Sequence, residues 1–504
     1  MSGETVDLAY NIISILFLSL LTAAFLSVAI MFVIDISQTK YAVRRNYPVI
    51  GRFRALFEHM GTFFRQYFFA MDREEMPFNR AFREWVYRAA KNVDNTIPFG
   101  STRDLSPAGT VSFVNCPYPT LEEDAAEVQP MIIGADCAHP FEAKSLFNIS
   151  GMSYGAISKV AVQALSKGAA KAGCWMNTGE GGLSPYHLEG GCDIVMQIGT
   201  AKYGVRDSDG NLSDERLREL ANIEQVRMFE IKLSQGAKPG KGGILPASKV
   251  TPEIAAIRGI PEGEDSISPN RHVDIDNPGQ LLDMIARVRE VTGKPVGFKL
   301  VIGGCNALDN LFDEIKKRGD HSAPDFISLD SSDGGTGAAP QPLMDFMGLP
   351  LKESLPMLID HLVGYGLRDR VRVICSGKLI TPSGVAWALC MGADFIVSAR
   401  GFMFALGCIQ AMQCNKNTCP TGIATHQKRL QRGLDPHDKA ARVDYYVKNL
   451  LHDVGIIAHS CGADQPRRLQ RRHARVAVGD GSSVSLSQRH PETTEGFPHG
   501  KPQE

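Results

Sequence analysis

Residues 326–338 read Phe326-Ile327-Ser328-Leu329-Asp330-Ser331-Ser332-Asp333-Gly334-Gly335-Thr336-Gly337-Ala338. An apolar run of the length of a β-strand ends here in a loop that is rich in glycine. Such a loop lets the backbone come close to a ligand, because glycine has no side chain. A single loop of this kind is often only a turn, so its meaning depends on the neighbouring strands.

The same pattern recurs along the chain from about residue 145. Further short apolar runs, each followed by a polar or glycine-rich loop and a helical stretch, lie at residues 146–149, 228–231, 296–301, 371–375 and 395–397. Repeated strand–helix alternation predicts a parallel sheet, and the length of the region suits a (β/α)8 TIM barrel. A doubly wound sheet is the alternative, but no G-x-G-x-x-G fingerprint follows a first strand. We therefore predict a barrel domain over residues 131–430.

Residues 8–34 have a different character. The 27 residues between Asp7 and Asp35 carry no charge, whereas about 20 apolar residues suffice to span a bilayer as a helix. A cleaved signal peptide is the alternative, but no Lys or Arg precedes the run, and the run is too long for the apolar h-region of a signal peptide. We therefore predict a transmembrane helix over residues 8–34.

The flanking charges predict how this helix is oriented. Lys40, Arg44, Arg45, Arg52 and Arg54 follow it and no basic residue precedes it, so the rest of the chain should lie in the cytoplasm. The 11 scattered cysteines are typical of a protein in a reducing compartment, which agrees with the cytoplasmic side. The expected location is the cell membrane, single-pass, with the catalytic domain on the cytoplasmic side. A net charge of −1 gives no sign of a nucleic-acid partner.

Three further regions complete the expected organisation. Residues 35–130 should form a membrane-proximal helical region. Its basic and aromatic residues between 50 and 75 suit either a segment on the membrane surface or a helix whose aromatic face packs on the barrel. After the barrel we expect a helical extension over residues 431–478 and a disordered tail over residues 479–504, which is rich in Gly, Ser and Pro.

Three cysteines, Cys408, Cys414 and Cys419, fall within 12 positions, and Pro420 follows the last. The C-x5-C-x4-C spacing can wrap a cluster, and soft thiolates suit iron–sulfur or zinc. With no fourth cysteine close by, a three-iron cluster fits better than a four-cysteine site. Three unrelated buried cysteines are the alternative.

Two loops follow the last two strand candidates, Cys375-Ser376-Gly377-Lys378 and Ser398-Ala399-Arg400-Gly401. Barrels commonly hold phosphate in the loops after strands seven and eight, through backbone N–H groups. The phosphate of FMN therefore fits here, with added charge from Lys378 and Arg400. Lys299 lies inside an otherwise apolar strand, so its side chain either extends along apolar surface to solvent or points into the barrel mouth. In the second case its ammonium would stabilise the anion that develops on a reduced flavin.

A basic, glycine-rich loop at residues 232–243 contains Lys232, Lys238 and Lys241, and Arg258 follows downstream. Three lysines and an arginine suggest capture of an anionic substrate such as a dicarboxylate, and a solvated basic loop is the alternative. Earlier, Glu180 stands between glycines in Asn177-Thr178-Gly179-Glu180-Gly181-Gly182. Its carboxylate could transfer a proton or orient ammonia. The alternative is that the segment is merely a turn.

Together these motifs resemble the synthase domain of the glutamate synthase large subunit. The resemblance begins at Gly151-Met152-Ser153-Tyr154-Gly155-Ala156 and at residues 177–182. It continues through residues 235–240, 299–301 and 333–338, and ends at the cysteine run and residues 417–425. The motifs keep the family's order throughout.

The resemblance implies a barrel that binds FMN and a 3Fe-4S cluster on Cys408, Cys414 and Cys419. It implies an oxidoreductase of the class acting on CH–NH2 donors, which reductively aminates 2-oxoglutarate to L-glutamate. Lys232, Lys238 and Arg258 would hold the oxo acid, with Glu180, Lys238 and Lys299 as catalytic residues. The implied FMN contacts are Met152, Ser153, Tyr154, Thr178, Gln197, Lys299, Asp333, Gly334, Gly335, Ser376, Gly377, Lys378, Ala399 and Arg400.

The chain departs from the family pattern in the basic loop. Lys241 and Ile244 stand where Glu and Gln are usual, so a donor to the oxo acid is missing, and Ser332 stands where His is frequent. No glutaminase or NAD(P) motif is found, so we expect ammonia from solution or a separate glutaminase subunit. Electrons would come from a ferredoxin or a membrane redox protein, and membrane lipid would surround the helix. The alternatives are a flavin oxidoreductase on another anionic oxo acid or amino acid, and a membrane-bound electron relay.

Overall fold

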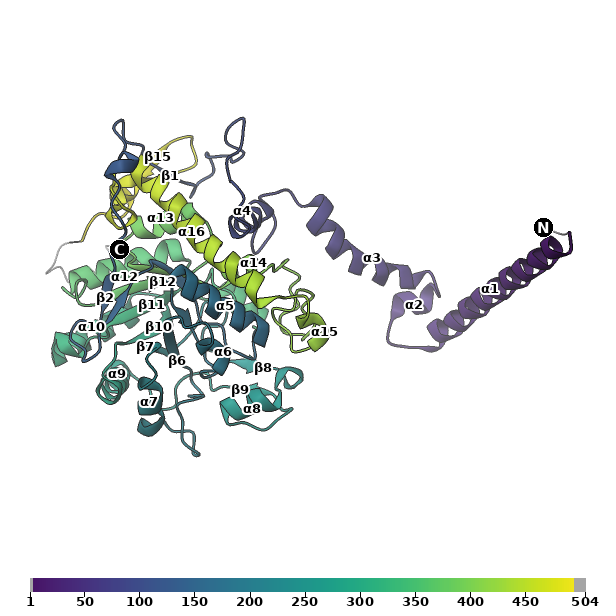
Figure 1. Ribbon diagram of the computed structural model, residues 1–504, viewed down its shortest axis with the longest axis horizontal. Helices are drawn as coiled ribbons and strands as arrows, with labels where there is room; N and C mark the ends of the chain where they lie inside the picture. The colour runs from purple at the N-terminus through teal and green to yellow at the C-terminus, as the bar shows by residue number, and fades with distance from the viewer. Residues whose placement is uncertain (1–2, 494–504) are drawn as a thin grey trace. The chain divides into compact units, whose positions relative to one another are not determined.

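The computed structural model describes residues 3–493, which form two compact units with the boundary between Ala81 and Phe82. The first unit contains the helices α1 (Gly3–Ser37), α2 (Ala42–Asn46) and α3 (Gly51–Phe64) and a π-helical turn (Arg65–Phe69) (Figure 1). From Asp7 to Ser37, α1 is long and apolar enough to cross a membrane. Its mean hydropathy reaches 2.6, and none of its most apolar part is buried.

A charged pair ties the start of α3 to the end of α1. Arg52 donates two hydrogen bonds of 2.8 Å to the Asp35 carboxylate, and the backbone N–H of Val49 donates a third of 3.0 Å. A bidentate pair of this kind fixes geometry as well as charge. The aromatic residues that follow are exposed, namely Phe53, Phe57, Phe63, Phe64, Tyr67, Phe68 and Phe69. The two predicted placements of this aromatic stretch, on the membrane surface or packed on the barrel, both stay predictions.

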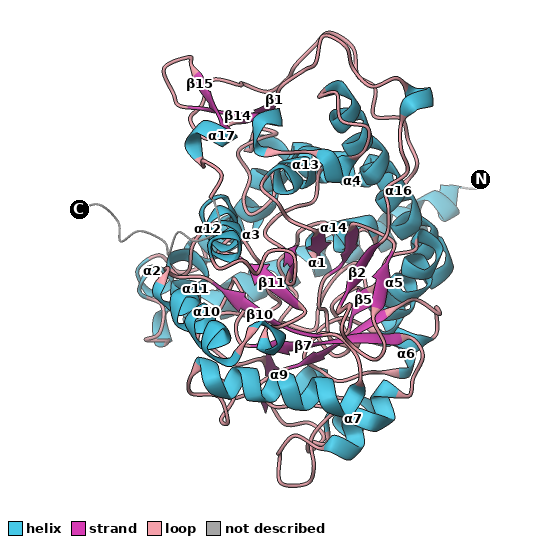
Figure 2. Cartoon of the chain, turned by 90° about the vertical axis from the view of Figure 1, so that its left-hand side faces the viewer, coloured by secondary structure: helices cyan, strands magenta, loops and turns pink. Residues whose placement is uncertain are grey.

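In the second unit, within residues 82–493, eight parallel strands close into a barrel, as predicted (Figure 2). Each strand pairs with the next along the chain, and the last pairs with the first. Both faces of these strands are covered, which is why they form nearly continuous apolar runs in the sequence. The strands are β4 (Phe147–Ile149), β5 (Met176–Asn177), β6 (Ile194–Ile198), β7 (Val226–Lys232), β10 (Val296–Val301), β11 (Phe326–Asp330), β12 (Arg372–Cys375) and β13 (Phe395–Ser398).

The helices packed around the barrel strands are α5 (Lys159–Ala172), α7 (Asp214–Ala221), α9 (Pro278–Thr292), α10 (Asn306–Arg318), α12 (Leu351–Gly364) and α13 (Pro382–Cys390). Four shorter helices lie in the connections between the strands or after the last one, namely α6 (Pro185–Leu188), α8 (Pro252–Arg258), α11 (Gln341–Phe346) and α14 (Arg400–Ala405). The long α16 (Pro436–Ser460) packs against α5 and α13 (Figure 1). Gly168 permits this contact, because a Cβ there would lie 2.4 Å from the Cβ of Val443.

A hairpin of β2 (Met131–Ile133) and β3 (Phe141–Ala143) covers the amino-terminal end of the barrel. Its Ile133 and Phe141 belong to one buried core with Trp175, Phe326 and Phe395 from the barrel. Phe326 and Phe395 are the first residues of their strands, so this core lies where the strands begin. The carboxyl ends of the strands lie at the opposite end, where barrel enzymes place their active sites.

The segments that flank the barrel differ from the predicted ones. Helix α4 (Arg80–Ala90) precedes residues 91–130, which are mostly irregular rather than helical, with one 3-10 turn at Glu122–Asp124. Within them β1 (Val111–Phe113) pairs with β14 (Ala474–Ala477), which pairs in turn with β15 (Ser483–Ser485). With α17 (Leu486–Arg489), residues 483–489 are folded where a disordered tail was predicted, and residues 494–504 lie outside the described residues. Composition alone cannot reveal a strand whose partner is so distant in the chain.

Candidate active site

The predicted site residues gather at the carboxyl ends of the barrel strands. Lys232 and Lys299 lie in β7 and β10, Gln197 lies in β6, and Arg258 ends α8. The cysteines lie in the loop that follows α14. Arg400 is the first residue of α14, and the loops after the strands carry Met152, Ser153, Tyr154, Thr178, Glu180, Lys238, Asp333, Gly334, Gly335, Ser376, Gly377, Lys378 and Ala399.

A small cavity of about 70 Å³ lies among these loops, and we call it the cationic cavity. Glu180, Lys238 and Arg258 line it together with Ile244, which belongs to a short hairpin of β8 (Ile244–Leu245) and β9 (Ser266–Ile267). The rest of the lining is Ser153, Ala156, Gly243, Leu245, Pro246, Lys249, Ser268, Thr336, Gly337, Ala338, Cys414 and Asn415. The fold thus brings the basic loop, the glycine-rich loop after β11 and the cysteine loop to one place.

Glu180 is held as a carboxylate in this cavity. Its Oε2 atom lies 2.9 Å from the Lys232 ammonium, which also donates a 2.5 Å hydrogen bond to Gln235 Oε1. Burial alone would raise the pKa of Glu180, but the charges of Lys232 and Lys238 outweigh it and keep this pKa below its ordinary value. The carboxylate is packed closely against Gly243, where a Cβ would lie 2.5 Å from Glu180 Oε1.

Lys238 and Arg258 are buried cations that have unused hydrogen-bond donors. Lys238 is 4% exposed, and its ammonium has no hydrogen-bond partner among residues 3–493. Arg258 is 5% exposed and donates to Ser266 Oγ and to the backbone oxygen of Tyr154, whereas its Nε atom has no partner within the same range. Burial lowers the pKa of both groups. Because an unpaired buried charge is costly, this arrangement favours an anionic ligand.

A second and much smaller cavity, of about 10 Å³, lies inside the barrel, and we call it the barrel cavity. Lys299 lines it and lies 3.2 Å from Asp330 Oδ2. Burial opposes the charge of Lys299, but Asp330 and Glu230 more than compensate and raise its pKa, whereas Lys299 keeps the pKa of Asp330 low. The remaining lining is Ser150, Trp175, Asn177, Val195, Met228, Glu230, Ser328, Ile374, Ser376 and Val397.

Two acidic residues of this region, Glu230 and Asp330, were not predicted as site residues. Glu230 accepts hydrogen bonds from Asn177 at 2.9 Å, from Gln197 at 2.6 Å and from Ser328 Oγ. Asp330 accepts from the N–H of Gly236 and from Ser376 Oγ, and so joins the loops after β7 and β12 to β11. Glu230 had a usable signal, because it interrupts the apolar run 228–231 just as Lys299 interrupts its own strand.

Lys249 is a further residue that the sequence did not single out. It is 2% exposed, and its ammonium donates to the backbone oxygens of Ala156 at 2.6 Å and Cys414 at 3.2 Å. Burial lowers the pKa of Lys249 to about 8. The lysine thereby joins the loop after β4 to the cysteine loop. No local pattern marks it, because both partners are distant in the chain.

The three cysteines of the predicted cluster lie in one loop. Cys408 and Cys419 are buried and Cys414 is half-buried. Burial raises the pKa of the Cys408 thiol to about 11. For Cys419 burial acts the same way, but hydrogen bonds from Thr421 and from nearby backbone N–H groups bring the pKa below its ordinary value. Among residues 3–493, no group of three or more His, Cys, Asp or Glu side chains is arranged to hold a metal ion, so the cluster stays a prediction.

The predicted FMN contacts are only partly gathered in these cavities. Ser153 lines the cationic cavity, and Lys299 and Ser376 line the barrel cavity. The other eleven line neither. Tyr154 donates its hydroxyl to Glu253 at 2.6 Å, and Asp333 accepts from the N–H of Leu351 at the start of α12. These two side chains therefore already have protein partners.

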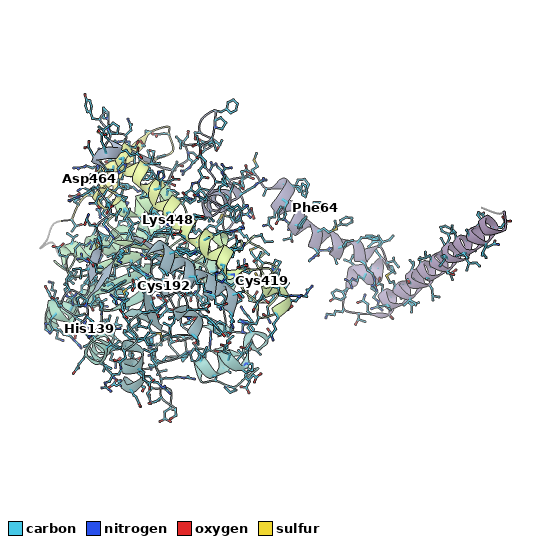
Figure 3. All side chains as sticks on the ribbon, viewed as in Figure 1. Phe64, His139, Cys192, Cys419, Lys448 and Asp464 are labelled. Atoms are coloured by element: carbon cyan, nitrogen blue, oxygen red, sulfur yellow. The ribbon has the colours of Figure 1, made fainter. Side chains whose placement is uncertain are left out.

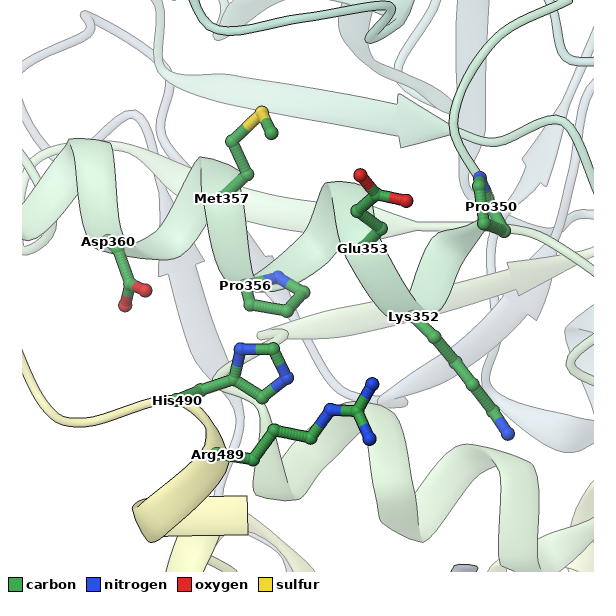
Figure 4. A pocket seen from close by; sticks show the side chains of 8 residues that line it. All are labelled: Pro350, Lys352, Glu353, Pro356, Met357, Asp360, Arg489 and His490. Atoms are coloured by element: carbon green, nitrogen blue, oxygen red, sulfur yellow. The ribbon is translucent and has the colours of Figure 1, made fainter. Parts of the chain in front are cut away.

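A separate cleft lies outside the barrel, between α12 and α17 (Figure 4). Its lining is Pro350, Lys352, Glu353, Pro356, Met357, Asp360, Arg489 and His490, and none of the predicted site residues is among them. The Lys352 ammonium already donates a 2.5 Å hydrogen bond to the backbone oxygen of Gly109. Both signs of charge occur in this cleft, so it lacks the excess of unpaired cations found in the cationic cavity.

Comparisons with known proteins agree with this arrangement. Residues 109–464 match a family model described as a conserved region in glutamate synthase. The glutamate synthase large subunit-like protein YerD of Bacillus subtilis (strain 168) is 40% identical over 495 residues, which cover 90% of this chain and 94% of YerD. The archaeal glutamate synthase (NADPH) of Methanocaldococcus jannaschii is 34% identical over 330 residues, which cover 65% of this chain and 61% of that protein.

Among solved structures, a variant of flavocytochrome b2 with sulfite bound is similar at a TM-score of 0.45 and 10% identity, over 81% of this chain and 82% of that one. The chain spans less than two thirds of the archaeal relative but nearly all of YerD. The family model covers the whole barrel, the cationic cavity and the cysteine loop. The chain therefore belongs to the glutamate synthase family.

Proposed function

We propose that the chain is an FMN- and iron–sulfur-dependent oxidoreductase that converts 2-oxoglutarate to L-glutamate. The balanced reaction takes one 2-oxoglutarate, one ammonium ion, two electrons and two protons to one L-glutamate and one water. Family membership supports the reaction class. The observation that carries the proposal is the Lys238 ammonium, which is buried, lines the cationic cavity and has no hydrogen-bond partner within residues 3–493.

A dicarboxylate suits this cavity because it brings two negative charges to two buried cations. Lys238 and Arg258 would each bind one carboxylate through charge-assisted hydrogen bonds, which are roughly twice as strong as neutral ones. Glu180, kept ionised by Lys232, would orient the ammonium ion and accept a proton from it. Lys232 would act through Glu180, because it does not itself line the cavity.

The residues at the barrel mouth fit the two cofactors. Lys299 and Ser376 would offer a cation and a hydroxyl to the polar edge of a flavin, and the segments at Gly377 and Arg400 would offer N–H groups and charge to its phosphate. Three thiols in one loop, with N–H groups directed at Cys419, suit an iron–sulfur cluster. When bound, FMN supplies hydride transfer to carbon and the 3Fe-4S cluster supplies one-electron transfer.

The proposal extends to the surroundings of the enzyme. Helix α1 would act as a single-pass anchor with the barrel on the cytoplasmic side, which its length and the basic residues after it support. Ammonia would come from solution or from a separate glutaminase, and electrons from a ferredoxin or a membrane redox protein.

The test uses the full-length protein in detergent, with FMN and iron measured on the same sample. After photoreduction, 2-oxoglutarate together with ammonium should reoxidise the flavin, and one L-glutamate should form for every two electrons lost. Either compound alone should leave the flavin reduced. If the complete mixture also leaves it reduced while FMN and iron are present, the proposed substrate is wrong.

A second candidate substrate is a 2-oxo acid with an apolar side chain, and Ile244 in the cavity wall favours it. Ile244→Gln separates the two. If 2-oxoglutarate is the substrate, the added donor should raise kcat/KM for it about fivefold, since one hydrogen bond contributes about 1 kcal/mol. If the apolar oxo acid is the substrate, the variant should lose activity toward it. A pure electron relay would react with neither, although its flavin would still be reduced and reoxidised by redox partners.

Removing residues 1–37 tests the anchor. The shortened chain should move from the membrane pellet to the supernatant, because no comparable apolar helix remains among the described residues. Ultracentrifugation after an alkaline carbonate wash measures this, with FMN absorbance reporting the folded barrel. A chain with α1 intact that carbonate releases from the membrane would show that α1 is not a spanning helix.

A further inference from the structure

The apolar side chains of α3 gather on one side of the helix. Their spacing of i, i+3, i+4, i+7, i+10 and i+11 confines them to an arc of about 120°. Five of the six are exposed, with Phe57 exposed to 63%. Figure 3 labels Phe64 near the carboxyl end of α3. We call these six residues the α3 face: Phe53, Leu56, Phe57, Met60, Phe63 and Phe64.

The opposite side of α3 is polar. It carries Arg54, Glu58 and Thr62, and the first two form an ion pair at 3.0 Å. Among the described residues, the rings of the α3 face contact only rings of the same helix and of the π-helical turn after it. A helix of 14 residues is marginally stable alone in water, so α3 needs an apolar partner for this face.

A compact corner joins the start of α3 to the end of α1. Asp35 of α1 is buried by the two hydrogen bonds from Arg52 and the one from the N–H of Val49. Gly51, the first residue of α3, packs on α2, where a Cβ would lie 2.8 Å from the backbone oxygen of Val43. The chain between Asp35 and Gly51 therefore folds back, and α3 begins at the level where α1 ends.

The length of α1 shows where that level lies in a membrane. The 27 uncharged residues before Asp35 form about 40 Å of helix at 1.5 Å per residue. A bilayer with its headgroups is about 40–45 Å thick. When α1 spans the bilayer, the corner and the first turn of α3 therefore lie among the headgroups. Aromatic side chains are enriched at that depth, and a helix with one apolar side lies there in the plane of the membrane.

The charge of the segment suits an anionic lipid surface. Residues 38–69 contain six basic residues and one acidic residue. Within residues 3–493, none of Lys40, Arg44 and Arg45 forms an ion pair, although Lys40 and Arg44 lie over the ring of Tyr41. Basic residues next to a spanning helix are attracted to the anionic lipids of the cytoplasmic leaflet. A second copy of α3 would instead bring like charges together, which is unfavourable.

We propose that α3 is an interfacial helix, with the α3 face buried at the boundary between the headgroups and the acyl chains of the cytoplasmic leaflet. Anionic headgroups pair with Lys40, Arg44 and Arg45. This rests on the proposed function in one respect, the spanning role of α1, and it adds a second membrane contact that lies in the plane of the bilayer. The competing occupants of the α3 face are the barrel of the same chain and a second copy of the chain.

The test uses the full-length, cofactor-loaded protein in vesicles of phosphatidylcholine and phosphatidylglycerol. In one form Phe57→p-benzoylphenylalanine places a photoreactive group on the α3 face. In the matched control Thr62→p-benzoylphenylalanine places it on the exposed polar side of the same helix. After illumination, mass spectrometry identifies whether the group has captured a lipid, a residue beyond 81 of the same chain, or a second chain. An alkaline carbonate wash of the same vesicles reports on α1 separately.

The group at position 57 should capture lipid at least about tenfold more often than the group at position 62, because the α3 face is in the acyl region and the polar side faces water. Adding Phe53→Glu with Phe64→Glu should lower lipid capture at position 57 by about 10- to 100-fold, since two charges would enter the apolar boundary. Ala55→Glu with Arg65→Glu places two new carboxylates on the polar side and should lower it by less than about threefold.

Capture of the barrel or of a second chain in place of lipid would overturn the proposal, and so would equal lipid capture at the two positions. None of these readouts needs an oxo acid. A chain that resists carbonate but captures no lipid at position 57 would refute the interfacial helix and leave α1 and the catalytic proposal standing. A chain that carbonate releases, yet that captures lipid there, would refute the spanning role of α1 and leave the membrane contact of α3 standing.

Discussion

Lys238→Met is expected to lower kcat/KM for 2-oxoglutarate by about 100- to 1000-fold. The lysine is buried, lines the cationic cavity and has no hydrogen-bond partner within residues 3–493. Removing one member of a buried charge pair costs about 2–5 kcal/mol, and each 1.4 kcal/mol is tenfold. Initial rates of flavin reoxidation by oxo acid and ammonium measure the effect, together with the affinity of the oxidised enzyme for 2-oxoglutarate.

The matched control is Lys241→Met, which removes an exposed lysine from the same loop and should change kcat/KM by less than about threefold, as a weak surface charge does. Substrate binding should also depend on pH. Because burial lowers the pKa of Lys238, the ammonium loses its proton at a lower pH than an exposed lysine would. Oxo-acid affinity should therefore fall as pH rises through that lowered pKa, and Lys238→Arg should remove this alkaline decline. Equal losses in the Lys238→Met and Lys241→Met variants would contradict the assignment.

Cys419→Ser is expected to abolish iron binding. A serine oxygen is a harder ligand than a thiolate, and two remaining cysteines leave one iron position of the cluster unprotected. Hydrogen bonds from Thr421 and from nearby N–H groups bring the pKa of the Cys419 thiol below its ordinary value, whereas burial raises the pKa of Cys408. Cys419 therefore ionises more readily than Cys408. Iron and acid-labile sulfide should fall from three and four per chain to near zero, with FMN retained.

Cys305→Ser provides the control, because Cys305 is an exposed cysteine outside the cysteine loop. This variant should keep full iron and sulfide. A Cys419→Ser protein that still contains three irons would show that the loop does not bind the cluster. If the wild-type protein contained zinc in place of iron, the loop would be a zinc site. Such a site could not pass single electrons to the flavin.

The barrel was predictable because its strands carry their own signal. The runs at 296–301 and 326–329 lie in β10 and β11, which are covered on both faces and are therefore mostly apolar. Strand β5, by contrast, has only two residues and leaves no pattern to detect. The folded segment at 483–489 escaped prediction because β15 depends on β14 and β14 on the distant β1.

Within the site, residue types were predictable but partners were not. Lys299 stood out in the sequence because it interrupts an otherwise apolar strand, and in the structure it is a buried charge. The same rule would have identified Glu230, the buried acidic residue in β7. Lys249 shows the limit. Its neighbours in the sequence are ordinary, and its role appears only when Ala156 and Cys414 come within hydrogen-bond distance of one ammonium.

The sequence by itself determined the apolar helix, the parallel barrel, the cysteine spacing and the set of cations around the site, because each depends on local hydrophobicity or on short spacings. Only the tertiary structure decided which of these cations are already neutralised. Lys232 is paired with Glu180, whereas Lys238 is buried without a hydrogen-bond partner in the described chain. The physical reason is that burial and pairing depend on loops from different strands, and a charge becomes a binding site only where those loops exclude water and leave it unpaired.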